Sequence, residues 1–183
     1  MNSRRTFFSC LIIALGAATI TADMNKVGNH NIGAAAGFVT GYGLSYRQWL
    51  GDWGFQLTTA PFHQEDEDES NTVFSVGATV LRKIREAKLV NLFVYLGPHY
   101  HLYRNVYTHT WAPYEPYAPS PTTRTEETVT RDRILFFGAG PGLDFHFLKI
   151  SLSVMCGFVG YRNFDDRETG VHFSGESALY YSF

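Results

Sequence analysis

Cysteine is scarce in this chain of 183 residues, with only Cys10 and Cys156 present. Cys10 lies within an amino-terminal stretch that reads as a signal peptide, so the mature chain keeps one cysteine and cannot form an intramolecular disulfide. An exported domain of this size without disulfides must obtain its stability in another way. A β-sheet closed on itself in a membrane is one such way.

Long hydrophobic runs and an excess of positive charge are missing as well. After residue 22 no apolar segment approaches the about 20 residues of a transmembrane helix, and convincing amphipathic helices are absent. The net charge is −2, whereas a domain that binds nucleic acid carries a basic patch. These absences exclude a helical membrane protein and predict no nucleic-acid partner.

The first 22 residues have the layout of a cleavable signal peptide. Arg4 and Arg5 give a basic start, Phe7–Ala18 form an apolar stretch, and cleavage after Ala22 leaves residues 23–183 as one domain. The segment around the two arginines also resembles a twin-arginine export signal. Because that route carries folded cargo and a membrane barrel crosses the inner membrane unfolded, we expect the general secretory route.

Alternation of apolar and polar residues dominates the mature chain. Aromatic residues make up 16% of the sequence, and runs of about 10 alternating residues have the length of a tilted transmembrane strand. Side chains on a strand alternate between its two faces, so each run gives one largely apolar and one largely small or polar face. The pattern predicts eight strands: 29–38, 43–50, 53–62, 72–83, 90–102, 135–147, 150–158 and 171–183.

The expected connections alternate in length. Short turns are expected near Gly51-Asp52, Ile84–Lys88 and Leu148-Lys149, and longer links at His63–Asn71, Arg104–Thr130 and Phe164–Gly170. A link at Gly37–Tyr42 would be unusually small for its side. Short periplasmic turns and longer extracellular loops are typical of outer-membrane barrels. An even strand number then places both ends of the domain on the periplasmic side.

The final residues carry the most specific signal. The ending Leu179-Tyr180-Tyr181-Ser182-Phe183 resembles the C-terminal signature of bacterial outer-membrane proteins, and residues 29–183 resemble the architecture of the OmpX, opacity-protein and OmpA transmembrane-domain group. The resemblance implies an eight-stranded antiparallel up-and-down transmembrane β-barrel in a Gram-negative outer membrane, in contact with lipopolysaccharide and other lipids. It also implies that the barrel-assembly machinery reads Phe183. We therefore expect a structural or surface-interaction protein, such as an adhesion factor, with no enzymatic activity and no cofactor.

Several polar side chains are expected to point into the barrel. The interior of an eight-stranded barrel is just wide enough for side chains to fill, which argues against a general diffusion pore. Buried charges need partners, so we expect a network of salt bridges and hydrogen bonds that holds the barrel rigid. The inward residues expected to form it are Arg47, His99, His101, Asp144, His146, His172 and Glu176.

Two alternative functions remain open at this point. His172-Phe173-Ser174 resembles the His-x-Ser of outer-membrane lipid A deacylases, in which histidine activates a serine nucleophile. The family places an orienting acid on a later strand, but no strand follows here. The other alternative is a soluble periplasmic barrel of the lipocalin type, for which Gly51-Asp52-Trp53 supplies the minimal Gly-x-Trp. Such a protein would turn its apolar face inward.

The remaining polar clusters predict no defined site. His99, His101 and His109 lack a further ligand at a fixed spacing, so we assign no metal. The acidic run Glu65–Glu69 lacks a glycine that could bend it around a cation and reads as a solvated loop. The loop 104–130 is rich in tyrosine and proline. Its exposed aromatic side chains are candidates for contact with an extracellular protein or glycan.

Overall fold

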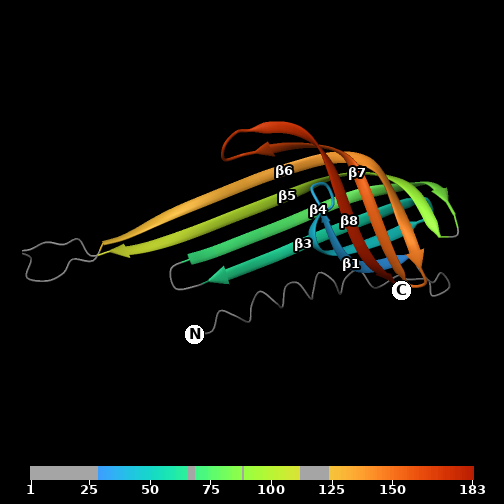
Figure 1. The fold of residues 1–183 in the computed structure, drawn as a ribbon, viewed down its shortest axis with the longest axis horizontal. Coiled ribbons are helices and arrows are strands. Elements are labelled where there is room, and N and C mark those ends of the chain that lie inside the picture. Colours follow the sequence, from blue (N-terminus) through green and yellow to red (C-terminus); the bar gives the residue numbers. More distant parts are fainter. Residues whose placement is uncertain (1–28, 66–68, 88, 112–123) are drawn as a thin grey trace, which may run out of the picture.

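The computed structural model describes residues 29–65, 69–87, 89–111 and 124–183, which form eight strands in a closed antiparallel β-barrel (Figure 1). Each strand pairs with the next, and β1 pairs with β8 to close the ring. The strands are β1 (His30–Gly37), β2 (Gly41–Leu50), β3 (Trp53–Glu65), β4 (Glu69–Glu86), β5 (Val90–Trp111), β6 (Arg124–Phe147), β7 (Ile150–Asn163) and β8 (Thr169–Ser182). The predicted fold class is thereby confirmed, while the expected signal peptide lies outside the described residues.

Among the described residues, no helix is long and apolar enough to cross a membrane.

The outer surface of the barrel wall is covered by an apolar band, the outward side chains that alternate with the buried ones. Phe158, Phe173 and Val171 are 69%, 65% and 74% exposed, although each is apolar. On β5 the band runs from Leu92 to Leu102. The predicted division of each strand into an apolar and a polar face is confirmed, and the apolar face is the outer one.

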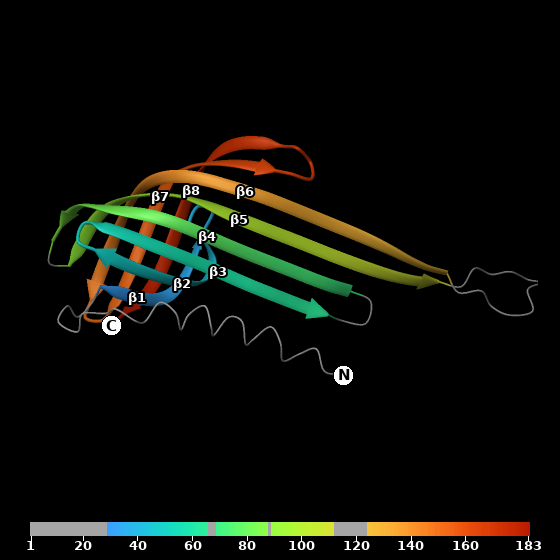
Figure 2. The same ribbon diagram turned by 180° about the vertical axis from the view of Figure 1, so that it is seen from behind.

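Strands β3 to β6 continue beyond the others and form a projecting sheet (Figures 1 and 2). This sheet comprises residues 60–65, 69–75, 101–111 and 124–133, and it begins where β2 stops pairing with β3 at Thr59. On its other side, β7 stops pairing with β6 at Ile134. In this sheet β3 pairs with β4, β4 with β5 and β5 with β6.

Two of the loops predicted from the sequence are wrong in part, because the projecting sheet extends into them. The link expected at 104–130 is strand up to Trp111 and again from Arg124, and the link expected at 63–71 is strand except for residues 66–68. Residues 66–68 and 112–123, with most of the acidic run and of the aromatic loop, lie outside the described residues. These segments were not predicted as strands because neither of their two faces is consistently apolar. A strand is inferred from sequence when apolar residues alternate with polar ones.

The opposite end of the barrel has the expected short turns. Gly51 turns between β2 and β3 with a φ of 63°, a left-handed conformation that glycine adopts without steric cost. Leu148 and Lys149 connect β6 to β7, and β4 ends four residues before β5 begins at Val90. Phe183 follows β8 at this same end, where its backbone N–H donates to the His30 carbonyl at 3.0 Å.

Candidate functional site

Arg47 lies at the centre of a polar cluster inside the barrel. Its Nη1 donates to the two carboxylate oxygens of Asp144 at 2.9 and 3.1 Å, and both side chains are only 1% exposed. Its Nε and Nη2 donate to Gln56 Oε1 at 3.1 and 2.8 Å. Arg47 and Asp144 were both expected inside the barrel, and the expectation that such buried charges have partners is confirmed for these two.

Neighbouring strands complete this inner cluster, which consists of Arg47, Gln56, Asp144, Ser153 and Tyr180. Arg47 Nη1 also donates to Ser153 Oγ at 2.9 Å, and Ser153 in turn donates to Asp144. The guanidinium carbon lies 4.3 Å from the centre of the Tyr180 ring, a cation–π distance. Because the residues come from five strands, β2, β3, β6, β7 and β8, the cluster fixes the barrel wall across its interior.

The connection between β1 and β2 folds into the barrel, and we call its residues Phe38–Thr40 the tucked turn. Val39 and Thr40 are fully buried. Their backbone N–H groups donate to the two carboxylate oxygens of Glu176, each at 3.0 Å. The inward charge of Glu176 is therefore matched by two backbone dipoles.

Two glycines on the barrel wall leave the space that the tucked turn fills. A Cβ atom on Gly77 would lie 2.4 Å from the Thr40 carbonyl oxygen, and one on Gly138 would lie 2.6 Å from Val39 Cγ2. Such contacts are too short to be tolerated, so side chains at these positions would displace the turn. The turn thereby occupies the lumen at the level where β4 and β6 carry glycine.

His99 holds the tucked turn from the opposite wall. Its Nδ1 lies 3.0 Å from the Phe38 carbonyl oxygen, and its Nε2 lies 2.9 Å from Ser75 Oγ. A carbonyl only accepts, so Nδ1 carries a proton and donates it to Phe38. Ser75 Oγ also accepts the backbone N–H of Tyr42 at 3.1 Å. The inward histidine His99 is therefore a structural partner of the turn.

The other inward histidines have separate surroundings. His146 Nε2 lies 2.9 Å from Asn91 Nδ2, near the short-turn end. His172 packs its ring against Phe38 and Tyr161, with ring centres 5.1 and 5.7 Å apart. His101 contacts the rings of Tyr42 and His99. No group of three metal-ligating side chains occurs in the part of the chain that the structure describes.

The geometry does not assemble the triad that the deacylase alternative requires. Ser174 is buried, and its Oγ donates to the Gly175 carbonyl at 3.5 Å. The carboxylate of Glu176 is occupied by the tucked turn. Within the described residues, no hydrogen bond joins His172 to Ser174, so the geometry supplies no activated serine.

A polar and aromatic surface covers the inward-facing side of the projecting sheet. Asn105 Nδ2 donates to Glu69 Oε1 at 3.0 Å and to the Tyr103 hydroxyl at 3.3 Å. Tyr107, two residues further along the same strand, is 50% exposed. Exposed aromatic rings beside amide and carboxylate groups can contact both apolar and hydrogen-bonding surfaces of a partner.

An ion pair fixes the start of the β7–β8 connection to the edge of β6. Arg133 Nη2 lies 2.8 Å from Asp165 Oδ1, and the Arg133 backbone N–H donates to Asp165 Oδ2 at 2.8 Å. These residues lie beyond the apolar band. The side-chain hydrogen bond from Arg133 lowers the pKa of the Asp165 carboxyl below its ordinary value of 3.8.

This ion pair predicts a local dependence on acid. Because the Asp165 pKa is lowered in the folded protein, its stabilising effect is complete above the ordinary carboxyl pKa and is lost as the pH falls through the lowered value. Hydrogen exchange at the Arg133 amide should therefore accelerate below about pH 3.8 relative to neighbouring amides. The Asp165→Asn variant should show fast exchange at Arg133 at neutral pH too. An amide equally protected in both proteins would contradict the assignment.

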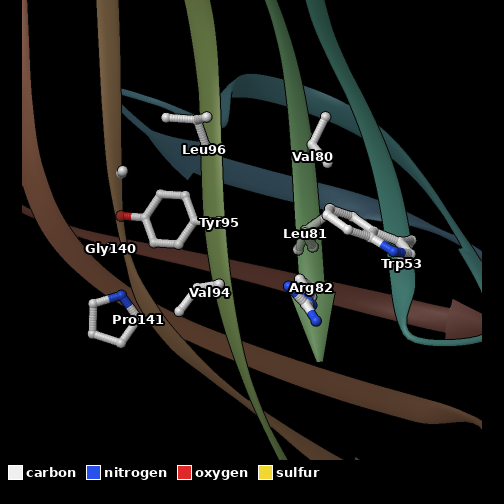
Figure 3. Close-up of a pocket in the computed structure, with 10 residues that line it drawn as sticks. Trp53, Val80, Leu81, Arg82, Val94, Tyr95, Leu96, Gly140 and Pro141 are labelled. Atoms are coloured by element: carbon white, nitrogen blue, oxygen red, sulfur yellow. The ribbon is translucent and has the colours of Figure 1, made fainter. Parts of the chain in front are cut away.

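The outer wall carries a shallow apolar groove of about 530 Å³ (Figure 3). Figure 3 shows Val80, Arg82, Val94 and Leu96 on two neighbouring strands, between Trp53 and Pro141. The Arg82 guanidinium lies 5.3 Å from the Trp53 ring centre, at the short-turn end of the apolar band. This arrangement of an aromatic ring and a cation beside apolar side chains is typical of a membrane–water boundary.

No family model matches the chain, and no curated protein matches it. A solved structure that is similar is the N-terminal β-barrel domain of Pseudomonas aeruginosa OprF, with 12% sequence identity. The similarity covers 86% of this chain and 100% of that domain, with a TM-score of 0.42. A similarity of this degree supports no inference about function. The proposal about function therefore rests on the side chains described above.

Sequence reasoning missed residues of the inner cluster and residues around the tucked turn. Gln56, Ser75 and Ser153 are uncharged and occur at ordinary inward positions, so nothing in the sequence distinguishes them from other small polar residues. The sequence does carry one indication that the tucked turn is unusual. The link expected at Gly37–Tyr42 is much shorter than the other links on its side of the barrel.

Proposed function

We propose that this protein is an outer-membrane β-barrel of structural or surface-interaction type, without enzymatic activity. The observation that carries the proposal is the reversal of polarity across the barrel wall. Phe137 and Phe158 are more than half exposed, while Arg47 and Asp144 are almost fully buried. In water this arrangement would leave a large continuous apolar surface unprotected, whereas lipid satisfies it.

The same reversal argues against the soluble alternative. A lipocalin-type barrel turns apolar side chains inward to bind an apolar ligand, but the inward side chains here include the inner cluster and Glu176. The height of the apolar band gives further support. On β5 it extends from Leu92 to Leu102, which matches the about 9–11 residues that a tilted transmembrane strand requires.

The projecting sheet supports a surface-interaction role. Strand β6 has 24 residues, or about 80 Å at about 3.3 Å per residue, which is roughly twice the length needed to cross the membrane. With the short turns and Phe183 in the periplasm, where the assembly machinery would read that residue, the projecting sheet lies outside the cell. Its exposed aromatic side chains, such as Tyr107, are available there to an extracellular protein or glycan.

The proposal predicts a heat-dependent gel shift and surface exposure. In the outer-membrane fraction, unboiled protein should migrate differently from boiled protein, because a closed barrel has no free edge within the membrane and resists detergent. On intact cells trypsin should cut within residues 104–131, since Arg104, Arg124 and Arg131 lie in the projecting sheet. The shortened barrel should retain its gel shift.

Two outcomes would contradict this assignment. Recovery of the protein in the soluble periplasmic fraction without a gel shift would support a soluble barrel. Complete protection of the projecting sheet on intact cells, with cleavage only after the outer membrane is opened, would reverse the proposed orientation.

A further inference from the structure

Four arginines lie together on the outer surface where the apolar band meets the projecting sheet. Arg104 follows Leu102 on β5, Arg131 and Arg133 precede Leu135 on β6, and Arg162 lies on β7. All four share the outward face, since they fall in the same alternation as the exposed apolar residues. We call Arg104, Arg131, Arg133 and Arg162 the arginine cluster.

The strand register brings two of these charges directly opposite each other. Arg104 is the cross-strand partner of Arg131, and such partners have Cα atoms about 4.5–5.5 Å apart. Like charges in this position destabilise a sheet. The register also pairs Leu135 with Arg162, which places Arg162 diagonally beside Arg133. The cluster therefore extends over three neighbouring strands.

Few negative groups offset this charge. Asp165 pairs with Arg133, and Arg162 lies over the Phe164 ring at 5.6 Å. Arg104, Arg131 and Arg162 form no ion pair within the described part of the chain. Glu127, the next outward acid on β6, is separated from Arg131 by the apolar Val129. Of the four guanidinium groups, only that of Arg133 has an ion-pair partner among the described residues.

The apolar residues beside the cluster indicate what kind of anion it would bind. Leu135 and Phe137 lie on the barrel side of Arg133, and both are exposed, at 39% and 56%. A ligand that fits both surfaces has phosphate groups at the membrane boundary and hydrocarbon chains along the wall. Arginine suits phosphate because its planar guanidinium can donate two parallel hydrogen bonds.

We infer that the arginine cluster binds the phosphate groups of a lipid A-type glycolipid in the outer leaflet, whose acyl chains lie along the adjoining apolar band. The inference rests on the proposed function, because it needs the projecting sheet to be extracellular. The bound phosphates would reduce the electrostatic repulsion between Arg104 and Arg131 and thereby stabilise this part of the sheet.

The test compares two variants of the mature barrel, refolded in detergent. In Arg104→Gln/Arg131→Gln the opposed charges are removed from the cluster. The control is Arg82→Gln, which removes an outward arginine at the opposite boundary of the band. Binding is measured by native mass spectrometry, and the unfolding temperature is measured with bis-phosphorylated lipid A, dephosphorylated lipid A or inorganic phosphate added.

Wild-type protein and the Arg82→Gln control should bind bis-phosphorylated lipid A and unfold at a higher temperature with it. The double variant should bind it at least tenfold more weakly, yet without lipid it should unfold no earlier than wild type, since it lacks the opposed charges. Equal binding by the double variant would overturn the inference. So would equal stabilisation by dephosphorylated lipid A or by inorganic phosphate.

The gel shift separates this inference from the proposed function. If the double variant and wild type bind lipid A alike while both keep the heat-dependent shift, only the cluster assignment is wrong. If wild type shows no shift and no outer-membrane location, the membrane assignment itself fails.

Discussion

The Asp144→Ala variant should lose about 3–5 kcal/mol of unfolding free energy, because it leaves the Arg47 guanidinium buried without its carboxylate. Gln56 and Ser153 can still accept from Arg47, but neither neutralises its charge. The measurement is urea unfolding of barrels refolded into lipid vesicles, followed by tryptophan fluorescence and the gel shift.

Asp165→Ala provides the matched control for this variant. It also removes the aspartate partner of an arginine. The Arg133–Asp165 pair, however, is exposed to solvent and contributes little to the free energy of unfolding. The double replacement Arg47→Met/Asp144→Leu should recover much of the lost stability, since no buried charge then remains. If Asp144→Ala and Asp165→Ala unfold at the same urea concentration, the inner cluster does not stabilise the barrel as described.

Replacing Glu176 with alanine should release the tucked turn. Two buried N–H groups, those of Val39 and Thr40, would lose their acceptors, at a cost on the order of 2–6 kcal/mol in unfolding free energy. Hydrogen exchange at these two amides should approach the rate of an exposed turn, because the turn can satisfy its amides only by moving toward water.

Two further variants make this result specific. Glu176→Gln keeps one side-chain oxygen and should fall between wild type and alanine. Glu86→Ala removes an exposed glutamate that pairs with Lys83, and it should leave both amides protected. Continued slow exchange at Val39 and Thr40 in the alanine variant would show that His99 and packing alone hold the turn.

The barrel wall could be predicted from sequence because successive side chains on a strand point to opposite faces. Assigning one residue to a face therefore assigns the rest of its strand. Once Phe183 and Leu179 are assigned to the outer face, the parity places Tyr180 and Glu176 inside, and the structure confirms this. Arg47 and Asp144 fall on the inner face by the same alternation. That they meet each other could not be predicted, because a contact between β2 and β6 depends on the stagger of strands that are not neighbours.

The projecting sheet could not be predicted for a different reason. The segment from Arg124 to Arg133 has Val129 as its one apolar residue, so neither face is apolar and the pattern cannot be distinguished from that of a solvated loop. The tucked turn escaped prediction because its partners are distant in sequence. Glu176 reads as an unmatched inward charge until the fold brings two backbone N–H groups to it.

The tucked turn has a consequence for how the chain folds. The bond from the Val39 amide to Glu176 spans 137 residues, so it joins the first hairpin to the last strand. Contacts of such long range form slowly, because the entropy of closing the intervening loop must be overcome first. A nascent chain that lacks β8 therefore has no carboxylate for the turn, and β1 also lacks one of its two neighbours. We therefore expect Val39 and Thr40 to occupy the lumen late in folding, when β8 completes the ring.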